Sequence, residues 1–201
     1  MIVFRNLVLA AFGAIGILGV SCAAYASILQ VTGNFHSVID GQFYRSAQPT
    51  SGELVSYVRA HGIRTVINLR GADPGVGWYD DEVKTAQGLG VTHIDFGMSA
   101  SKAVSPEQAE RLVQLMASAP KPILIHCRSG ADRSGFAAAL YVKKIAGLGE
   151  ARAEGQLSFY YGHVGIPVVS AAYAMDRSWE NIEAQEKKQA QAELLNGATV
   201  R

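Results

Sequence analysis

Apolar and polar positions along this chain fall into blocks that predict strands alternating with helices. Four runs are short, rich in β-branched and aromatic residues, and bounded by glycine, proline or polar residues, as strands are. They cover residues 42–47, 63–69, 91–98 and 123–126. The segments between them are longer and carry apolar residues at helical spacing. This alternation favours an α/β fold.

Two of the intervening helices have start or stop signals in the sequence. Thr50 and Glu53 have the spacing of a capping box, and Gly62 follows the amphipathic run as a helix stop. Ser105 and Gln108 repeat the capping-box spacing, and a proline follows Ser105 at the first helical position. Helices are therefore expected from Thr50 to Gly62 and from Ser105 onward.

Two further helices are expected in the C-terminal half. Residues 134–146 are strongly apolar and are followed by Gly147, which suits a helix end. Farther on, Met175, Trp179 and Ile182 lie on one helical face, which we expect to pack on the core.

The central strands are continuously apolar, which is typical of a parallel sheet with helices on both faces. We expect a central, mainly parallel sheet flanked by helices. Ligands of such sheets bind at the carboxyl ends of the strands. The strand over 123–126 therefore places Cys127 at the edge where a site is expected.

The N-terminus differs from the rest, because no Asp, Glu, Lys or Arg occurs between Arg5 and Asp40. Residues 7–26 are almost wholly apolar, and as a helix they would span roughly 30 Å, enough for membrane association. The positive-inside rule then puts the body on the periplasmic or exported side of a bacterial cell envelope. An uncleaved anchor and a signal cleaved after the Ala-Tyr-Ala at 24–26 stay equally open, and a lipoprotein signal at Cys22 ranks third.

Length and composition fit one globular domain behind this segment. The chain has 201 residues, 49% of them hydrophobic and 17% charged, with a formal net charge of +1. We expect a signal peptide or anchor over 1–28, a linker over 29–41, one domain over 42–185 and a polar tail over 186–201. The interleaved charges form no basic stripe, which argues against a nucleic-acid partner.

The two cysteines also point to chemistry. Cys22 lies in the N-terminal segment, so the body retains only Cys127 and has no intramolecular disulfide. A single cysteine on the exported side favours a reactive thiol, and an inert buried cysteine is the alternative.

Cys127 begins a short loop that must turn a strand into a helix. A tight loop with a glycine directs successive backbone N–H groups into one concavity at a helix N-terminus, which is an anion site. Arg133 adds a guanidinium that can hold two phosphate oxygens, and the same field favours the thiolate of Cys127. We expect His126 to support the loop and Ser134 to assist the departing thiolate. The predicted phosphate-binding loop comprises Arg128, Ser129, Gly130, Ala131, Asp132 and Arg133.

The sequence His-Cys-Arg-Ser-Gly-Ala-Asp-Arg-Ser over 126–134 resembles the signature of the cysteine-dependent protein tyrosine phosphatase superfamily. Residues 43–49 and 65–70 are similar to elements of its bacterial dual-specificity-like members, and the likeness covers roughly residues 40–165. The resemblance implies attack by the Cys127 thiolate on phosphorus, a phosphocysteine intermediate, and its hydrolysis. It implies stabilisation of the phosphate oxygens by Arg133, and no cofactor. No cluster has metal-ligand spacing, so no metal is expected.

The family's general acid is an aspartate on a loop that here would cover residues 97–105, which contain no Asp or Glu. Asp132 is the first candidate, because such an aspartate has been proposed as the acid in lipid-active bacterial phosphatases and myotubularins with similar loops. Its alternative role is a salt bridge with Arg70 or another base. Asp95 is the second candidate, and its alternative is a strand-end residue paired to backbone or a cation.

Other polar residues have weaker claims. By resemblance to related enzymes Tyr44 and Arg45 could pack near the pocket, but a plain edge-strand role is the preferred expectation. His163 is expected in a surface or packing role. An acidic turn in solvent explains Asp73, Asp80 and Asp81.

Three functions stay open. The first, and the preferred one, is a protein phosphatase acting on phosphotyrosine, with phosphoserine and phosphothreonine as further substrates. The second is a phosphatase for phosphoinositide or another small phosphorylated ligand, which the cation of Arg128 would suit. The third is a catalytically silent phosphate-binding module.

Overall fold

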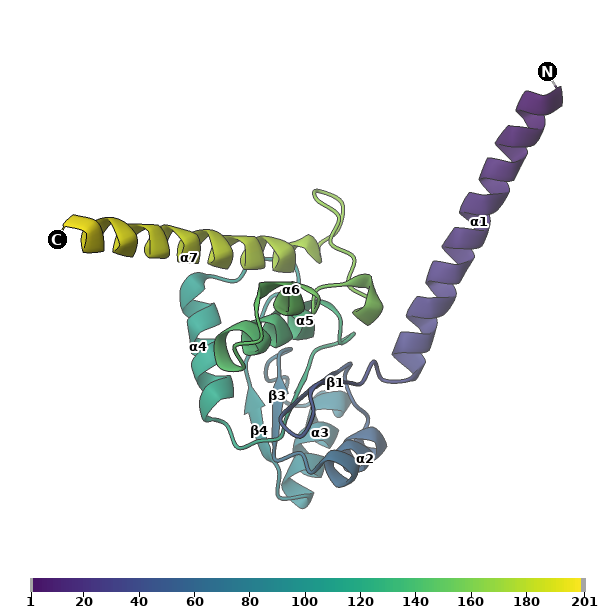
Figure 1. Ribbon diagram of the computed structural model, residues 1–201. Coiled ribbons are helices and arrows are strands. Elements are labelled where there is room, and N and C mark those ends of the chain that lie inside the picture. Colours follow the sequence, from purple (N-terminus) through teal and green to yellow (C-terminus); the bar gives the residue numbers. More distant parts are fainter. Residues whose placement is uncertain (1, 200–201) are drawn as a thin grey trace. The chain divides into compact units, whose positions relative to one another are not determined.

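The structure is a computed structural model that describes residues 2–199, and the chain divides into two compact units between Thr32 and Gly33. The first unit is a single helix, α1 (Ile2–Val31) (Figure 1). Within it, the 20 residues Phe12–Val31 are long and apolar enough to cross a membrane.

The second unit is built on a five-stranded sheet in the order β1-β2-β5-β3-β4. The strands are β1 (His36–Ile39), β2 (Phe43–Ser46), β3 (Thr65–Asn68), β4 (Thr92–Asp95) and β5 (Ile123–His126). Only the β1–β2 pair is antiparallel, and the other three pairs are parallel. The predicted α/β fold with a mainly parallel sheet is therefore confirmed, and β5 lies at its centre.

The linker expected over 29–41 needs a correction, because residues 36–39 form β1. His36 and Ser37 pair with Arg45 and Tyr44 of β2, and Val38 is buried. The run is short and only partly apolar, so its local pattern resembles a linker. Pairing with β2 satisfies its backbone groups, which is a tertiary effect. One consequence is that β2 is not an edge strand.

The helices of the second unit cover both faces of the sheet (Figure 1). Their bounds are α2 (Ser51–His61), α3 (Gly77–Gly88), α4 (Pro106–Ser118), α5 (Asp132–Leu140), η1 (Tyr141–Ile145), α6 (Glu150–Glu154), η2 (Phe159–Tyr161) and α7 (Tyr173–Thr199). On one face, Val66 and Leu124 pack with Leu54 of α2 and Ala86 of α3. On the other, α4, α5, η1 and α7 contribute most of the core. Alternate side chains of each strand thus enter opposite cores.

The predicted caps form with one change. Thr50 and Glu53 make both hydrogen bonds of the capping box, and Gly62 ends α2 with φ 63°. Ser105 caps α4 by accepting from the Gln108 N–H. The Gln108 side chain, however, donates to the carbonyl of Gly97 instead of completing a box.

The C-terminal half matches the predicted packing and differs at two helix ends. Met175, Trp179 and Ile182 are buried in the core, as their spacing predicts. The helix expected over 134–146 starts at Asp132 and finishes as the π-helical turn η1.

Most of the polar tail expected over 186–201 belongs to α7, which is helical to Thr199, and residues 200–201 lie outside the described residues. Glu186 explains part of this order, because its carboxylate binds Lys143, at 2.9 Å, and Lys144 of η1.

Candidate active site

Cys127 follows β5 directly and begins the loop that leads into α5. The side chain is 1% exposed, and α5 begins five residues later at Asp132. The neighbours of β5 are β2 and β3, both parallel to it, so their carboxyl ends lie at the same edge. The site is thus at the predicted edge of the sheet.

Four successive carbonyl groups of the loop are held on its outer side. The carbonyl of Arg128 accepts from the Gln48 N–H at 3.3 Å, and that of Ser129 accepts from Asn34 Nδ2 at 2.9 Å. The carbonyls of Gly130 and Ala131 both accept from Arg45 Nη2 at 2.8 Å. In a trans peptide the N–H points away from the preceding C=O. The next four N–H groups therefore point away from the partners of these carbonyls, as the predicted anion site requires.

Arg45 is the main support of this loop. Its side chain is fully buried, donates also to the Gln156 carbonyl at 2.8 Å, and stacks on Tyr161 with 4.0 Å between guanidinium carbon and ring centroid. Burial lowers the pKa of Arg45 to about 10, so it stays a cation at neutral pH. The expected edge-strand role is wrong, because β1 covers the outer side of β2.

Gly130 is required by space and by backbone conformation. Its φ is +73°, and a Cβ there would lie 2.6 Å from the Ala47 nitrogen. Any side chain would push the loop off β2.

Arg133 is oriented by backbone carbonyls at the ends of neighbouring strands. Its Nη1 donates to the carbonyls of Leu69 and Met98, both at 3.3 Å. These contacts place its guanidinium at the carboxyl edge of the sheet.

Ser134 is buried in the first turn of α5. Within residues 2–199 its hydroxyl has no hydrogen-bond partner, so the expected bond to the Cys127 sulfur is not formed here. A buried hydroxyl without a partner remains available to a charge that develops beside it.

His126 is hydrogen-bonded to Glu82 of α3, a partner that the sequence analysis did not predict. His126 Nε2 and His93 Nε2 lie 3.1 and 2.7 Å from Glu82 Oε1. Burial opposes the charge of Glu82, but the hydrogen bonds from His126 and His93 lower its pKa to about 2. The expected support role of His126 thus has a partner, which is a buried carboxylate of α3. The one local signal for the burial of Glu82 is its spacing of four residues from Ala86, which puts both on one face of α3.

Asp132 makes an ion pair that the sequence did not predict. His163 Nδ1 lies 2.7 Å from Asp132 Oδ1, and His163 Nε2 lies 3.0 Å from Asp176 Oδ2 of α7. Burial disfavours the imidazolium, but the two carboxylates outweigh it and raise the pKa of His163. His163 was expected only on the surface or in packing, whereas in the structure it bridges two carboxylates. The base that pairs with Asp132 is His163, not Arg70.

Asp95 ends β4 with both carboxylate oxygens engaged. Oδ1 accepts from Asn68 Nδ2 at 2.8 Å, and Oδ2 accepts from the Tyr79 hydroxyl at 2.6 Å. The hydrogen bond to Asp95 raises the pKa of Tyr79 to about 12, so the phenol remains the donor. This pairing matches a strand-end role, with side chains as partners.

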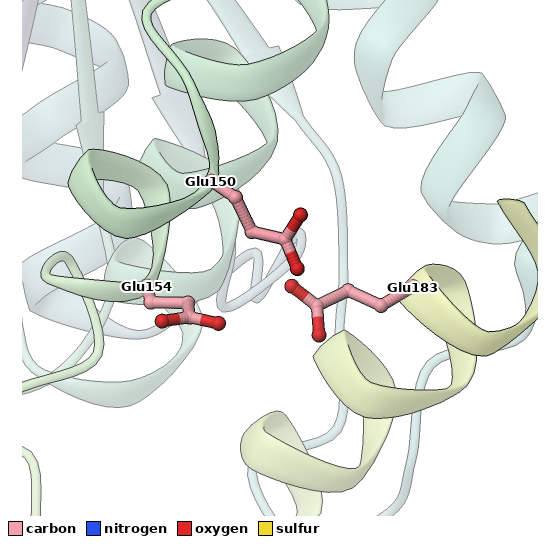
Figure 2. A group of neighbouring side chains, drawn as sticks. All are labelled: Glu150, Glu154 and Glu183. Carbon is pink, nitrogen blue, oxygen red and sulfur yellow. The ribbon is translucent and has the colours of Figure 1, made fainter. Parts of the chain in front are cut away.

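A group of carboxylates lies away from the loop, where Glu150 and Glu154 of α6 approach Glu183 of α7 (Figure 2). Lys143 Nζ lies 3.8 Å from Glu150 and 3.9 Å from Glu183. This lysine already supplies positive charge there, and we assign no cation to the group.

Comparison with solved structures shows the same fold. TpbA from P. aeruginosa matches with a TM-score of 0.56 and 21% identity, covering 73% of this chain and 84% of that one. A mutant form of Tk-PTP matches with a TM-score of 0.55 and 20% identity, covering 75% and 97%. The catalytic core of Siw14 from S. cerevisiae matches at 0.56 and 16%, covering 77% and 92%. None of the curated proteins compared matches this chain.

The sequence itself matches one family model over most of its length. The model is described as DSP-PTPase phosphatase fused to NAD+ kinase, and it matches residues 30–192, from before β1 into α7. The match includes the whole loop from Cys127 to Arg133 and the residues that hold it. This chain therefore belongs to the DSP-PTPase family of cysteine-based phosphatases.

Proposed function

We propose that this protein hydrolyses phosphomonoesters at Cys127, and that phosphotyrosine in proteins is its first substrate class, with phosphoserine and phosphothreonine next. The observation that carries the proposal is the loop whose four successive carbonyls are bound, because this directs the four following amides away from those partners, in a loop that begins at a buried cysteine. TpbA has been crystallised in complex with phosphotyrosine, which supports that class here.

The reaction takes two displacements at phosphorus. In the first, the Cys127 thiolate forms an S–P bond while the bond from phosphorus to the leaving oxygen breaks, and an acid gives that oxygen a proton. In the second, water attacks phosphorus, loses a proton to the same group, and the S–P bond breaks to release phosphate. The loop amides and Arg133 stabilise the charge on the equatorial oxygens in both steps. Ser134 donates to the sulfur as it departs.

Asp132 is the proposed acid and then base. It adjoins Arg133 at the start of α5, and its side chain is 26% exposed, which keeps it accessible to substrate. His163 occupies Oδ1, so Oδ2 is the oxygen that would carry the transferred proton. Asp95 is the alternative acid, and its two hydrogen bonds to Asn68 and Tyr79 would have to open for it to act.

A small phosphorylated molecule is the second candidate substrate. Arg128 is exposed beside the nucleophile and adds a cation that a multiply charged ligand would use. Siw14 is described as a PP-IP phosphatase, which is consistent with such ligands on this fold.

Turnover of an aryl phosphate distinguishes an active phosphatase from a catalytically silent phosphate-binding module. Wild type should exceed Cys127→Ser in kcat by a factor on the order of 10³ or more, because the serine hydroxyl cannot replace the thiolate. Equal rates for the two proteins would leave only phosphate binding.

The acid is assigned by comparing two leaving groups. Asp132→Asn should lose about 10²-fold in kcat on an alkyl phosphate and much less on an aryl phosphate, whose leaving group needs no proton. Asp95→Asn is the matched control and should show no such difference. The reverse pattern would assign Asp95, and equal losses on both substrates would remove Asp132 as the acid.

We also propose that α1 associates with a membrane, as an uncleaved anchor or as a signal that is removed, and that the second unit lies on the exported side of the cell envelope. The apolar stretch Phe12–Val31 supports this. N-terminal sequencing of the mature protein distinguishes the two fates.

A further inference from the structure

The His163 ring lies between two carboxylates, one at the start of α5 and one at the start of α7. Its Nδ1 is 2.7 Å from Asp132 Oδ1, and its Nε2 is 3.0 Å from Asp176 Oδ2. The His163 side chain is 3% exposed, whereas those of Asp132 and Asp176 are 26% and 25% exposed. A buried ring with both nitrogens occupied has a defined orientation, and it fixes the carboxylate oxygen that it contacts.

The two contacts require two protons, one in each. A neutral imidazole donates from only one ring nitrogen, whereas an imidazolium donates from both. Burial opposes the charge of His163, but the hydrogen bonds and charges of Asp132 and Asp176 outweigh burial and raise its pKa. At pH 6.5 and below, the imidazolium between two carboxylates is therefore the main form.

The other charged and titratable groups around Asp132 come from β2, α5 and η2. Arg45 of β2 is buried and donates to the last carbonyl before Asp132, and the Tyr161 ring of η2 stacks on it. Arg133 follows Asp132 in the chain, but its Nη1 donates to two backbone carbonyls at the carboxyl edge of the sheet. Across residues 2–199, His163 is the one basic side chain with a nitrogen within 4.0 Å of an Asp132 carboxylate oxygen.

We propose that His163 is a positioning residue for the acid step: it holds Asp132 Oδ1 and stabilises the carboxylate that remains once Asp132 has given up its proton. This inference rests on the proposed phosphatase activity with Asp132 as the acid. In the first step the Oδ2–H bond of Asp132 breaks and the proton goes to the leaving oxygen. His163 keeps both of its protons, and its charge faces the new carboxylate. In the second step Oδ2 takes a proton from the attacking water, which restores the acid.

Two effects on the reaction follow from this arrangement. A cation in contact with Asp132 favours its ionised form, so Asp132 is a stronger acid than it would be alone. The hydrogen bond at Oδ1 also limits the orientations of the carboxyl group, which lowers the cost of aligning Oδ2 with the leaving oxygen. A bridge that only joined α5 to α7 would have neither effect.

NMR titration of the histidine rings in the full-length protein measures the charge coupling without turnover. Asp132→Asn keeps the size of the side chain and removes its charge, so the titration midpoint of His163 should fall by about one pH unit. The signal of His61, which stacks on Phe35 of the other core, is the internal control and should keep its midpoint. An unchanged midpoint for His163 would overturn the proposal.

The pH profile of kcat/KM on an alkyl phosphate tests the effect on the acid. Without the cation Asp132 should keep its proton to higher pH, so the alkaline fall in kcat/KM should move up by about one pH unit in His163→Asn. The plateau of kcat should fall by a factor on the order of ten, because the acid is weaker and no longer held at Oδ1. His61→Asn is the matched control and should change neither. A lower unfolding midpoint in His163→Asn with an unshifted profile would leave only a structural bridge and reject the positioning role.

The double variant Asp132→Asn with His163→Asn identifies the acid on which His163 acts. Its pH profile should match that of Asp132→Asn alone, and a further shift would mean that His163 acts on another acid, such as Asp95. The NMR titration stays decisive if His163→Asn does not fold, because Asp132→Asn changes a partly exposed side chain. Failure of wild type to hydrolyse any aryl phosphate would reject the phosphatase proposal separately, because the NMR midpoints do not depend on turnover.

Discussion

Arg45 shows what a single residue contributes to this site. A buried guanidinium loses its hydration, and here carbonyl oxygens of the loop, together with the Gln156 carbonyl and the Tyr161 ring, replace it. The same contacts orient the peptide groups of the loop. The stability of the fold and the shape of the loop therefore depend on one fully buried side chain.

Arg45→Lys keeps the charge but loses the planar fork that reaches two carbonyls. We expect a loss of at least about 2 kcal/mol in the free energy of unfolding, measured in urea, with a fall in kcat/KM. Arg59→Lys on the exposed side of α2 should change stability by no more than about 0.5 kcal/mol. An Arg45→Lys protein with wild-type kcat/KM would show that the loop keeps its shape without the fork.

Gly130→Ala separates backbone strain from steric contact. Gly41 is the matched control, because its φ of +68° is similar but nothing lies within 4 Å of an added Cβ. Gly41→Ala should cost about 1–2 kcal/mol of unfolding free energy, from the left-handed backbone alone. Gly130→Ala should cost at least about 1 kcal/mol more, because the methyl group overlaps β2. If both variants lost the same unfolding free energy in urea, β2 would shift to accommodate the methyl group at no cost.

At the scale of elements, His163 connects the start of α5 with the start of α7. It is only 4% exposed, and its two ring nitrogens pair with Asp132 and Asp176. Gly165 allows this arrangement, because a Cβ there would lie 2.1 Å from Asp176 Oδ2. The phosphate loop is thereby attached to the C-terminal helix through a titratable group.

This bridge predicts a pH dependence of stability. The pKa of His163 is raised above its usual 6.5, so the imidazolium stabilises the fold fully below that pH and loses its effect as the pH rises through the raised value. The difference in unfolding free energy between wild type and His163→Asn should therefore be largest below pH 6.5 and shrink as the pH rises above it. His61→Asn, at a histidine stacked on Phe35 of the other core, is the control. A difference that stays constant with pH would mean that His163 acts as a neutral side chain.

At the scale of the whole molecule, the division between Thr32 and Gly33 separates a membrane-length helix from a domain with its own core. Phe12, Ile17 and Val20 of α1 are each about 70% exposed, which is unfavourable in water and favourable in a bilayer. Asn34, Arg45 and Gln48, which bind the four loop carbonyls, all belong to the second unit.

A chain that lacks residues 1–32 should therefore fold, stay in solution and keep the kcat/KM of the full chain on an aryl phosphate. In vesicle flotation, the full chain should float and the shortened chain should not. Flotation of the shortened chain, or loss of its activity, would place part of the fold or of the membrane contact outside α1.

The sequence alone determined the features that depend on neighbours in the chain. Strand and helix alternation, the caps at Thr50 and Ser105, and the loop from Cys127 to Arg133 all follow from periodicities or spacings of a few residues. The short strand β1 was missed because its pattern is weak, and that error placed Arg45 at an edge.

Only the tertiary structure decided which polar residues support the site. Arg45 and Gly130 are 85 positions apart, Glu82 and His126 are 44 apart, and Asp132 and His163 are 31 apart. A buried polar group must find a partner, but no local rule says where along the chain that partner lies. The sequence therefore predicts the nucleophile and its loop, whereas only the folded chain shows which buried arginine, glutamate and histidine support that loop.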